Sequence, residues 1–189
     1  MYFTKKLLFI FIFFGCFTFN AQESERKKVL NIFTFEEAEK LLQQKSKPIL
    51  VFLYTDWCKI CHGMKKTTFK NKKVIQLLNE KFYFIMLNGE EKRDITFFGR
   101  TFNYKPSGAN TGIHELASEL ATIEKRISYP TTTILNTKLE ISLQLIGFLN
   151  SKKMMDTLLK YQQVNYFSQT LGCKDLNPKL DTKPTELIK

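Results

Sequence analysis

Residues 56–63, with the sequence DWCKICHG, contain two cysteines, Cys58 and Cys61, that are separated by two residues. A Cys-x-x-Cys pair that opens a helix is typical of thiol–disulfide exchange, whereas the same pair followed by a histidine, here His62, is the attachment signal for a c-type haem. Both chemistries would use the same two sulfur atoms. The elements predicted around this segment therefore have to distinguish a redox pair from a haem site.

A buried strand is predicted immediately before the cysteines, and a helix directly after the first of them. Residues 49–54, ILVFLY, form a continuous apolar run, which is typical of a strand buried on both faces of a sheet. Residues 59–69 can continue as a helix, and residues 82–87, FYFIML, predict a second buried strand. Two strands joined through helices form a right-handed βαβ unit. Cys58 would then lie where a strand passes into a helix.

This position would suit a redox pair. Residues at positions i and i+3 share one face of a helix, so the two sulfurs can bond to each other. Cys58 would lie at the helix N-terminus, where unpaired N–H groups and the helix dipole stabilise a thiolate. Cys61 would lie one turn further along and be shielded. We therefore expect Cys58 to attack a substrate disulfide and Cys61 to resolve the mixed disulfide that forms.

The remaining periodicity predicts one α/β domain, with no internal repeat and no second core. Thr34 and Glu37 form a capping-box pattern at the start of a helix over residues 35–45. The other predicted elements are a short strand at 29–33, a helix from Asn71, a hairpin of 95–98 with 101–104, a helix near 113–121, strands at 131–135 and 141–146, and a final helix from Ser151.

Tyr129-Pro130, just before the strand at 131–135, is the second feature with a chemical use. A proline at the start of a strand removes a backbone donor. If the bond before Pro130 is cis, the turn leaves the Tyr129 backbone available to pair with an extended substrate. An ordinary trans proline is the commoner arrangement by far.

Together these residues resemble the thioredoxin-like superfamily, and they are especially similar to the C-terminal periplasmic domain of the membrane electron transporter DsbD. The similarity covers about residues 29–161, and its matching features are the strand at 49–54, Asp56-Trp57-Cys58, Cys61, Thr68-Phe69, Tyr129-Pro130-Thr131 and Gly147. The resemblance implies a thioredoxin fold, in which helices flank a central mixed sheet. It also implies a redox-active Cys58–Cys61 disulfide and a cis bond at Pro130.

The chain departs from this family in three ways. Residues 89–126 look like an insertion before the proline strand, and could shape a groove or cover a sheet edge. Phe52 stands where the family has a buried aspartate, the usual proton acceptor for the resolving thiol. The Lys59-Ile60 pair between the cysteines is neither the Gly-Pro of reductants nor the Pro-His of strong oxidants. We expect a reductase or isomerase rather than a strong oxidant.

A haem site would need His62 as the proximal ligand and a sixth ligand, which His114 or one of five methionines could supply. Such a pocket is built largely of helices, and the strands around the motif argue against it. The redox pair is therefore the preferred interpretation, and we expect no cofactor and no bound metal. A non-catalytic binding module, with the disulfide as a structural staple, is the alternative within the same fold.

Three neighbours of the cysteines have candidate roles. Trp57 is expected to flank the substrate groove together with Tyr129 and Pro130. Asp56 is either a turn residue or a local acid–base group. The charge of His62 could lower a cysteine pKa and so replace part of the missing aspartate, or His62 could simply be an exposed polar residue.

The N-terminus has the layout of a secretory signal peptide over residues 1–21, with Lys5-Lys6 before an apolar run and Ala21 at its end. Lipidation at Cys16 is less favoured, because Phe13-Phe14-Gly15 fits that signal poorly. Cleavage after Ala21 would remove two lysines and lower the net charge from +11 to +9. The lysines are scattered and no nucleic-acid motif is present, so a solvated basic surface is expected.

An exported location would place the protein outside the cytoplasm, for example in a periplasm. Its domain is expected to cover residues 22–164, followed by a loose tail over 165–189 in which Cys173 is an unpaired thiol. The expected partners are exported proteins that carry disulfides, and an upstream thiol electron donor such as a membrane protein.

Overall fold

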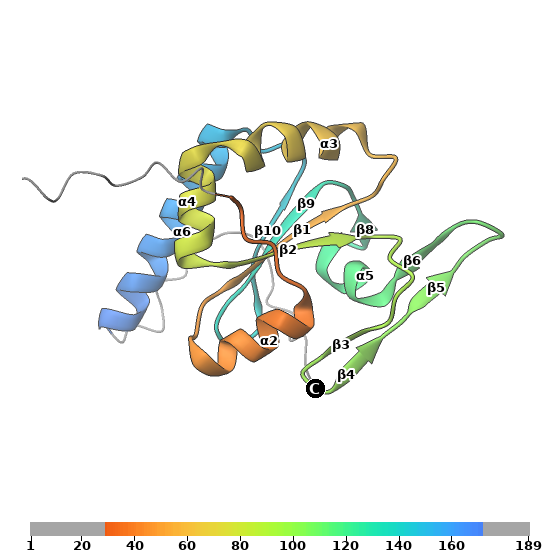
Figure 1. Cartoon of the computed structure of the whole chain (residues 1–189), viewed down its shortest axis with the longest axis horizontal. Coiled ribbons are helices and arrows are strands. Elements are labelled where there is room, and N and C mark those ends of the chain that lie inside the picture. The colour runs from red at the N-terminus through yellow and green to blue at the C-terminus, as the bar shows by residue number, and fades with distance from the viewer. Residues whose placement is uncertain (1–28, 172–189) are drawn as a thin grey trace, which may run out of the picture.

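The computed structural model describes residues 29–171. The predictions for the signal peptide, Cys16 and Cys173 lie outside the described residues. Within them, the chain forms a mixed sheet with helices on both faces, as Figure 1 shows. This arrangement confirms the predicted α/β class. No helix of the described part of the chain is both long enough and apolar enough to cross a lipid bilayer.

The central sheet has four strands in the order β10-β9-β1-β2. Its members are β1 (Ile49–Tyr54), β2 (Tyr83–Asn88), β9 (Thr131–Leu135) and β10 (Ile141–Ile146). β1 pairs parallel to β2 and antiparallel to β9, which in turn pairs antiparallel to β10. β1 is the interior strand whose end leads directly to the cysteines. Its six residues, apolar throughout, suit a strand covered on both faces.

Helices cover the two faces of the sheet separately (Figure 1). The elements are α2 (Phe35–Gln44), α3 (Lys59–Lys66), a 3₁₀ turn (Thr68–Lys70), α4 (Lys72–Lys81), α5 (Glu115–Ala121) and α6 (Ser151–Leu171). The first core cluster holds Val51 and Leu53 of β1 with buried residues of α2 and α5. The second holds Leu50 and Phe52 with buried residues of α3, α4 and α6. Alternate residues of β1 therefore enter opposite cores.

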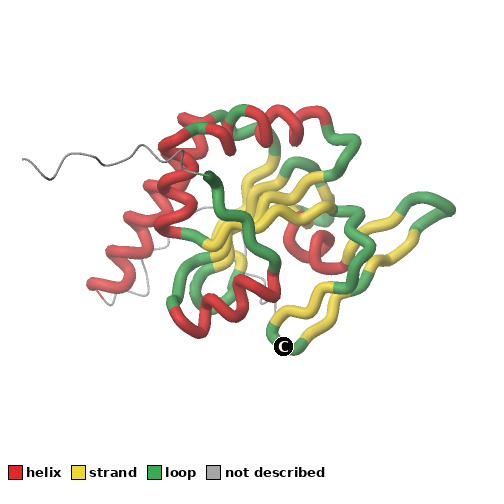
Figure 2. Tube along the Cα trace, in the orientation of Figure 1, coloured by secondary structure: helices red, strands yellow, loops and turns green. Residues whose placement is uncertain are grey.

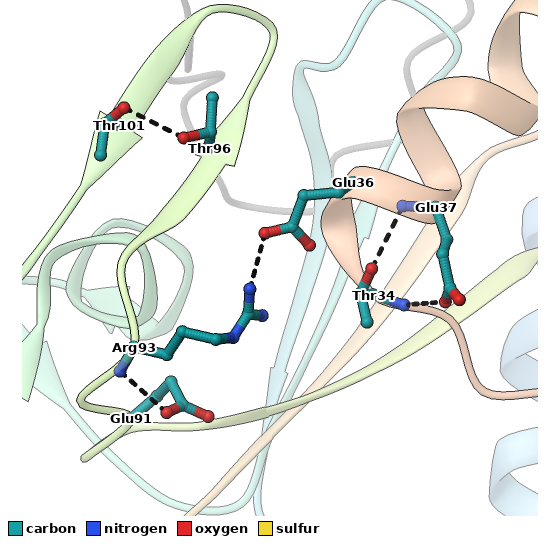
Figure 3. A network of polar contacts seen from close by, with 7 residues as sticks. All are labelled: Thr34, Glu36, Glu37, Glu91, Arg93, Thr96 and Thr101. Atoms are coloured by element: carbon teal, nitrogen blue, oxygen red, sulfur yellow. Dashed lines mark hydrogen bonds and ion pairs between the residues drawn. The ribbon is translucent and has the colours of Figure 1, made fainter.

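The capping box predicted at the start of α2 is present. The Glu37 N–H donates to Thr34 Oγ1 at 3.1 Å, and the Thr34 N–H donates to Glu37 Oε2 at 2.8 Å (Figure 3). These two bonds satisfy backbone donors that the first helical turn leaves unpaired. In the same figure, Arg93 Nη1 donates to Glu36 Oε1 at 2.9 Å, which ties the segment after β2 to this helix.

Three boundaries differ from the predictions. The strand at 29–33 was wrong: only Phe33 forms a bridge, to Ile85, because the backbone of Val29 and Asn31 bonds to the Asn79 side chain instead. The helix predicted to reach residue 69 ends at Lys66 and continues as the 3₁₀ turn. The tail was placed too early, because α6 extends to Leu171.

Residues 89–127, the predicted insertion and one residue more, contain three hairpins and one helix, and Figure 2 shows two of the hairpins extending beyond the sheet. The hairpins pair β3 (Ile95–Phe97) with β4 (Arg100–Phe102), β5 (Tyr104–Pro106) with β6 (Gly112–His114), and β7 (Thr122–Ile123) with β8 (Arg126–Ile127). The first hairpin confirms the prediction, and it turns at Phe98-Gly99, both with positive φ. Buried Phe97, Phe102 and Leu116 anchor the segment to the α2 side of the core.

Candidate functional site

Cys58 and Cys61 form a disulfide at the junction between β1 and α3, with an S–S distance of 2.01 Å. Cys58 is the N-cap of α3, and its sulfur accepts a hydrogen bond from the Cys61 N–H at 3.1 Å. Its own N–H donates to the Thr55 carbonyl at 3.2 Å. Cys58 retains 6% of its surface and Cys61 none. The first cysteine is therefore the more accessible, and it lies where free N–H groups favour a thiolate.

Apolar side chains surround the disulfide on the inner side. Cys58 and Cys61 belong to the second core cluster, together with Phe52. The Phe52 ring is fully buried and lies 4.8 Å from the Phe69 ring, centroid to centroid. Its partner in the parallel β2 is Met86. The place of the family's aspartate is thus filled by Phe52, an apolar residue that cannot accept a proton from Cys61.

Trp57 and Tyr129 form one wall beside the disulfide. Their rings make an edge-to-face contact with centroids 6.2 Å apart, and the Trp57 Nε1–H donates to Glu90 Oε1 at 3.0 Å. Trp57 is 66% exposed, which is unusual for so large an aromatic residue. Tyr129 packs over Gly89, where a Cβ atom would lie 2.0 Å from the phenol oxygen. Only glycine leaves room for the phenol there.

Burial, with a smaller contribution from the charge of Glu90, raises the pKa of Tyr129 to about 12. The phenol therefore stays protonated at physiological pH and can donate a hydrogen bond. It cannot serve as a base there.

The peptide bond between Tyr129 and Pro130 is cis, as the resemblance implied. The Pro130 carbonyl accepts from the Gly147 N–H at 2.8 Å, and the Ser128 carbonyl accepts from the Thr131 hydroxyl at 2.7 Å. These bonds hold the loop on both sides of Tyr129 without using the Tyr129 amide or carbonyl. Gly147 has φ of +93°, a conformation that favours glycine.

Asp56 and His62 are tied to each other through the backbone. His62 Nε2–H donates to the Asp56 carbonyl oxygen at 2.8 Å, so the proton of neutral His62 lies on Nε2. The Asp56 carboxylate accepts from Asn88 Nδ2 at 2.9 Å. His62 is exposed, as expected for a polar residue on the outer side of the helix. Its proposed effect on the cysteines stays a prediction.

Two exposed apolar residues near the disulfide were not predicted as contact residues: Ile60, considered only as part of the Lys59-Ile60 pair between the cysteines, and Phe148. They keep 55% and 46% of their surface, and the Phe148 ring lies beside Gly63 of α3, in ordinary van der Waals contact range of a Cβ placed there. Glu90, the acceptor for Trp57, was missed as well. The signal for Phe148 was its position directly after Gly147, one of the residues that match the resembled family. With Trp57, these residues give the cysteines an apolar rim.

His114, considered as a haem ligand, lies fully buried in β6. Its backbone N–H donates to the Gly89 carbonyl at 2.8 Å, and neither ring nitrogen has a bonded partner among the described residues. Burial lowers the pKa of this imidazole, against a partly opposing effect of the Phe102 and Arg93 backbones. Nowhere in residues 29–171 do three or more His, Cys, Asp or Glu side chains gather to hold a metal ion.

This burial predicts a loss of stability over a pH window that opens at about 6.5 and extends to lower pH. The unfolded chain takes up a proton on His114 near pH 6.5, whereas the folded chain resists it until lower pH. The free energy of unfolding should therefore decrease as pH decreases in this window, by at most about 1.4 kcal/mol per pH unit for one proton. Urea unfolding of the native protein and of His114→Phe measures the effect, and His62→Phe is the control at an exposed position.

The His114→Phe protein should show a flatter pH profile in that window, and the His62→Phe protein should follow the native one. The buried histidine would have no such role if all three profiles had the same slope. Carboxylates with lowered pKa values, such as Glu36 and Glu115, lose their contribution only as pH falls below about 4.5. They do not interfere with the measurement.

Known proteins share this architecture. The family model of the thioredoxin-like domain matches residues 35–163. Spermatogenesis-associated protein 20 of Mus musculus is 33% identical over 67 residues, which are 35% of this chain and 8% of that protein. A thioredoxin from Thermus thermophilus has 20% identity and a TM-score of 0.51, with 76% of this chain and 93% of that chain covered. The DsbH oxidoreductase has 14% identity and a TM-score of 0.52, with 72% and 86% covered.

The similarities to solved structures concern the fold. The DsbD C-terminal domain of Neisseria meningitidis, in its reduced form, is also among the similar structures, at 17% identity and a TM-score of 0.44, with 65% of this chain and 88% of that chain covered. The superfamily predicted from the cysteine motif and the proline loop is confirmed by the family model, which covers more than half of the chain. The chain therefore belongs to the thioredoxin-like domain family.

Proposed function

We propose that the protein is an exported thiol–disulfide oxidoreductase that reduces or isomerises disulfides. The fold and the bonded Cys58–Cys61 pair support an oxidoreductase of this kind. The observation that carries the proposal is the position of Cys58 at the N-cap of α3, where its sulfur accepts the Cys61 N–H. The same donor would stabilise a Cys58 thiolate after reduction.

The reaction would proceed in two exchanges. The Cys58 thiolate attacks one sulfur of a substrate disulfide, and the other substrate sulfur leaves as a thiolate that takes a proton from solvent. Cys61, after losing its proton, then attacks Cys58 Sγ and breaks the bond to the substrate. The substrate leaves with both sulfurs reduced, and the protein keeps the Cys58–Cys61 disulfide. Two electrons from a thiol donor would regenerate the dithiol.

The surface around Cys58 suits an extended, partly apolar substrate segment. Trp57, Ile60 and Phe148 expose apolar surface on the sides of the disulfide. The hydrogen bonds that fix the proline loop go to Pro130 and Ser128, so the Tyr129 backbone can pair with a substrate strand. The apolar side chains would thus supply contact area, while backbone pairing with the proline loop would orient the substrate strand.

The direction of electron flow follows from what stabilises the thiolate. A strong oxidant needs a strongly stabilised Cys58 thiolate, because its reduced form must be favoured. Here the N–H groups at the helix N-terminus would stabilise the thiolate, but His62 would add no hydrogen bond to it, because its Nε2–H donates to the Asp56 carbonyl oxygen. A moderate stabilisation favours the reductase or isomerase assignment.

The proposed partners are exported proteins with disulfides, together with a thiol donor at or in the membrane. The support is the layout of residues 1–21, which is that of a secretory signal peptide. An oxidising compartment would also supply disulfides to reduce.

The reduction potential of the Cys58–Cys61 pair tests the proposed function. Full-length protein is equilibrated with glutathione redox buffers, and the bonded fraction is measured after acid quenching and alkylation. We expect a potential above about −300 mV, within reach of cellular thiol donors. A value below that, with no reaction towards added disulfides, would instead favour the binding module with a structural staple. The low exposure of Cys58, 6%, is the observation on the side of that second candidate.

A further inference from the structure

Thr132 carries a buried hydroxyl that has no hydrogen-bond partner among the described residues. It lies on β9 as the register partner of Phe52. Residues directly opposite each other in an antiparallel pair project to the same face of the sheet. The Thr132 hydroxyl therefore faces the core cluster that contains Phe52, Cys58 and Cys61.

The neighbouring threonines confirm this orientation. Thr133 Oγ1 donates to the Leu120 carbonyl of α5 at 2.7 Å, on the opposite face of the sheet. Thr131 Oγ1 donates to the Ser128 carbonyl within the loop. Thr68, another buried hydroxyl on the cysteine side, donates to the Leu149 carbonyl at 2.6 Å. These three hydroxyls are occupied, whereas that of Thr132 is available.

A buried hydroxyl without a partner costs free energy, so a role in another state of the protein would explain it. We propose that Thr132 Oγ1 is the hydrogen-bonding partner of the Cys61 sulfur when the disulfide is open. From β9 it would interact with the resolving thiol, with which the family's aspartate interacts from the position that Phe52 occupies on β1. Thr132 is a positioning residue in this proposal, which rests on the proposed exchange function.

The hydroxyl would act in the resolving exchange. Cys61 must lose its proton to solvent before its sulfur attacks Cys58 Sγ, and the departing substrate thiolate takes up a proton in turn. Thr132 would donate its O–H to the Cys61 thiolate and hold the sulfur in the apolar cluster until attack. Hydrogen bonds to a charged acceptor are the strong ones, and low polarity around them increases their effect.

The other titratable side chains near Cys61 have contacts of their own. The His62 Nε2–H donates to the Asp56 carbonyl, and the Asp56 carboxylate bonds to Asn88. Titratable groups on the adjoining elements include Cys58 at the N-cap of α3, Lys59, His62, Lys65 and Lys66 of α3, Tyr54 of β1, Asp56 after it, Glu90 after β2, and Tyr129 before β9. Lys65 Nζ lies over the Tyr54 ring, and Glu90 accepts a hydrogen bond from Trp57. Thr132 is the residue of β9 that turns a buried hydroxyl without a partner among the described residues towards the cluster containing Cys61.

The test follows the Cys61 thiolate itself. Full-length Cys58→Ser protein, labelled with ¹³Cβ-cysteine, is titrated by NMR, and the other cysteine signals are assigned with Cys16→Ser and Cys173→Ser. Adding Thr132→Val removes the hydroxyl but keeps the shape of the side chain. We expect the Cys61 midpoint to move upward, equivalent to about tenfold less thiolate at a given pH below it. Thr132→Ser should restore the native midpoint.

Thr133→Val is the matched control, since it is the same change one residue away on the opposite face. It should leave the Cys61 midpoint unchanged, although it loses a hydrogen bond and lowers stability. Thr132→Val should not lower the stability of the oxidised protein, because it loses none. If valine disturbs the packing, Thr132→Ala provides the same comparison.

An unchanged Cys61 midpoint in the Thr132 variants would overturn the proposal. So would a larger upward movement with Thr55→Val, because Thr55 carries the other buried hydroxyl without a partner among residues 29–166. The titration needs no substrate. A protein that shows the Thr132 effect but exchanges no disulfide would therefore contradict the proposed function and leave this inference in place.

Discussion

Protein with Cys61→Ser is expected to accumulate covalent complexes with its substrates, whereas protein with Cys58→Ser is expected to form none. Cys58 is the more exposed of the two cysteines and lies at the N-cap of α3, so it is the one expected to attack. Serine at position 61 cannot displace the substrate from Cys58, and the mixed disulfide persists. The complexes are detected on non-reducing gels after acid quenching, and a reductant should separate them by cleaving the mixed disulfide.

Cys173 provides the control, because it is a third thiol outside the described residues. Complexes formed by Cys61→Ser should be unchanged when Cys173→Ser is added, and mass spectrometry should place the bond on Cys58. Loss of the complexes with Cys173→Ser would move the reactive sulfur to the C-terminal segment. A folded Cys61→Ser protein that traps nothing would count against the exchange mechanism as a whole.

Either cysteine substitution should also reduce the steady-state rate of disulfide reduction, by on the order of a thousandfold or more. The two sulfurs act as one unit, so the double variant should be little worse than either single one. Additive losses would instead indicate that the cysteines contribute through separate steps.

The parts of the site that sequence could predict are those with strong local signals. The apolar run of β1 is interior to the sheet, and the Thr34–Glu37 capping box starts α2 as its residue types require. Cys58 and Cys61 come shortly after this strand, so predicting their place in the fold required only that the end of the strand be predicted correctly. The cis bond at Pro130 was implied by the resemblance and not by X-Pro statistics, which favour trans.

The parts that it could not predict depend on contacts between distant segments. The strand expected at 29–33 was lost because Asn79, on α4, bonds to the backbone of Val29 and Asn31. Glu90 joins the site through a hydrogen bond to Trp57, which is 33 residues away in the sequence, and no local pattern indicates this. The face on which Thr132 lies depends on its register with Phe52, which is set by the pairing of β9 with β1. A one-residue slip would turn its hydroxyl to the opposite core.

Phe52→Asp, which restores the residue type of the resembled family, is expected to destabilise this protein severely. Phe52 is fully buried, packs on Phe69, and has Met86 as its neighbour on β2. Loss of the ring together with burial of a carboxyl should cost roughly 4–6 kcal/mol. That is a large part of the roughly 5–15 kcal/mol by which ordinary domains are stable. Urea unfolding of the oxidised protein measures the loss.

Phe52→Asn separates the charge from the lost packing, because asparagine has the same size as aspartate and does not titrate. Burial would raise the pKa of the carboxyl introduced by Phe52→Asp above its unfolded value of about 3.9, so the unfolded chain releases this proton first. Stability of Phe52→Asp should then fall relative to Phe52→Asn as pH rises from about 4 towards neutrality. Equal stability of the two variants at neutral pH would show that water or a cation reaches this position. The apolar cluster would then not exclude water from Cys61, and low polarity would no longer strengthen the proposed hydrogen bond from the Thr132 hydroxyl.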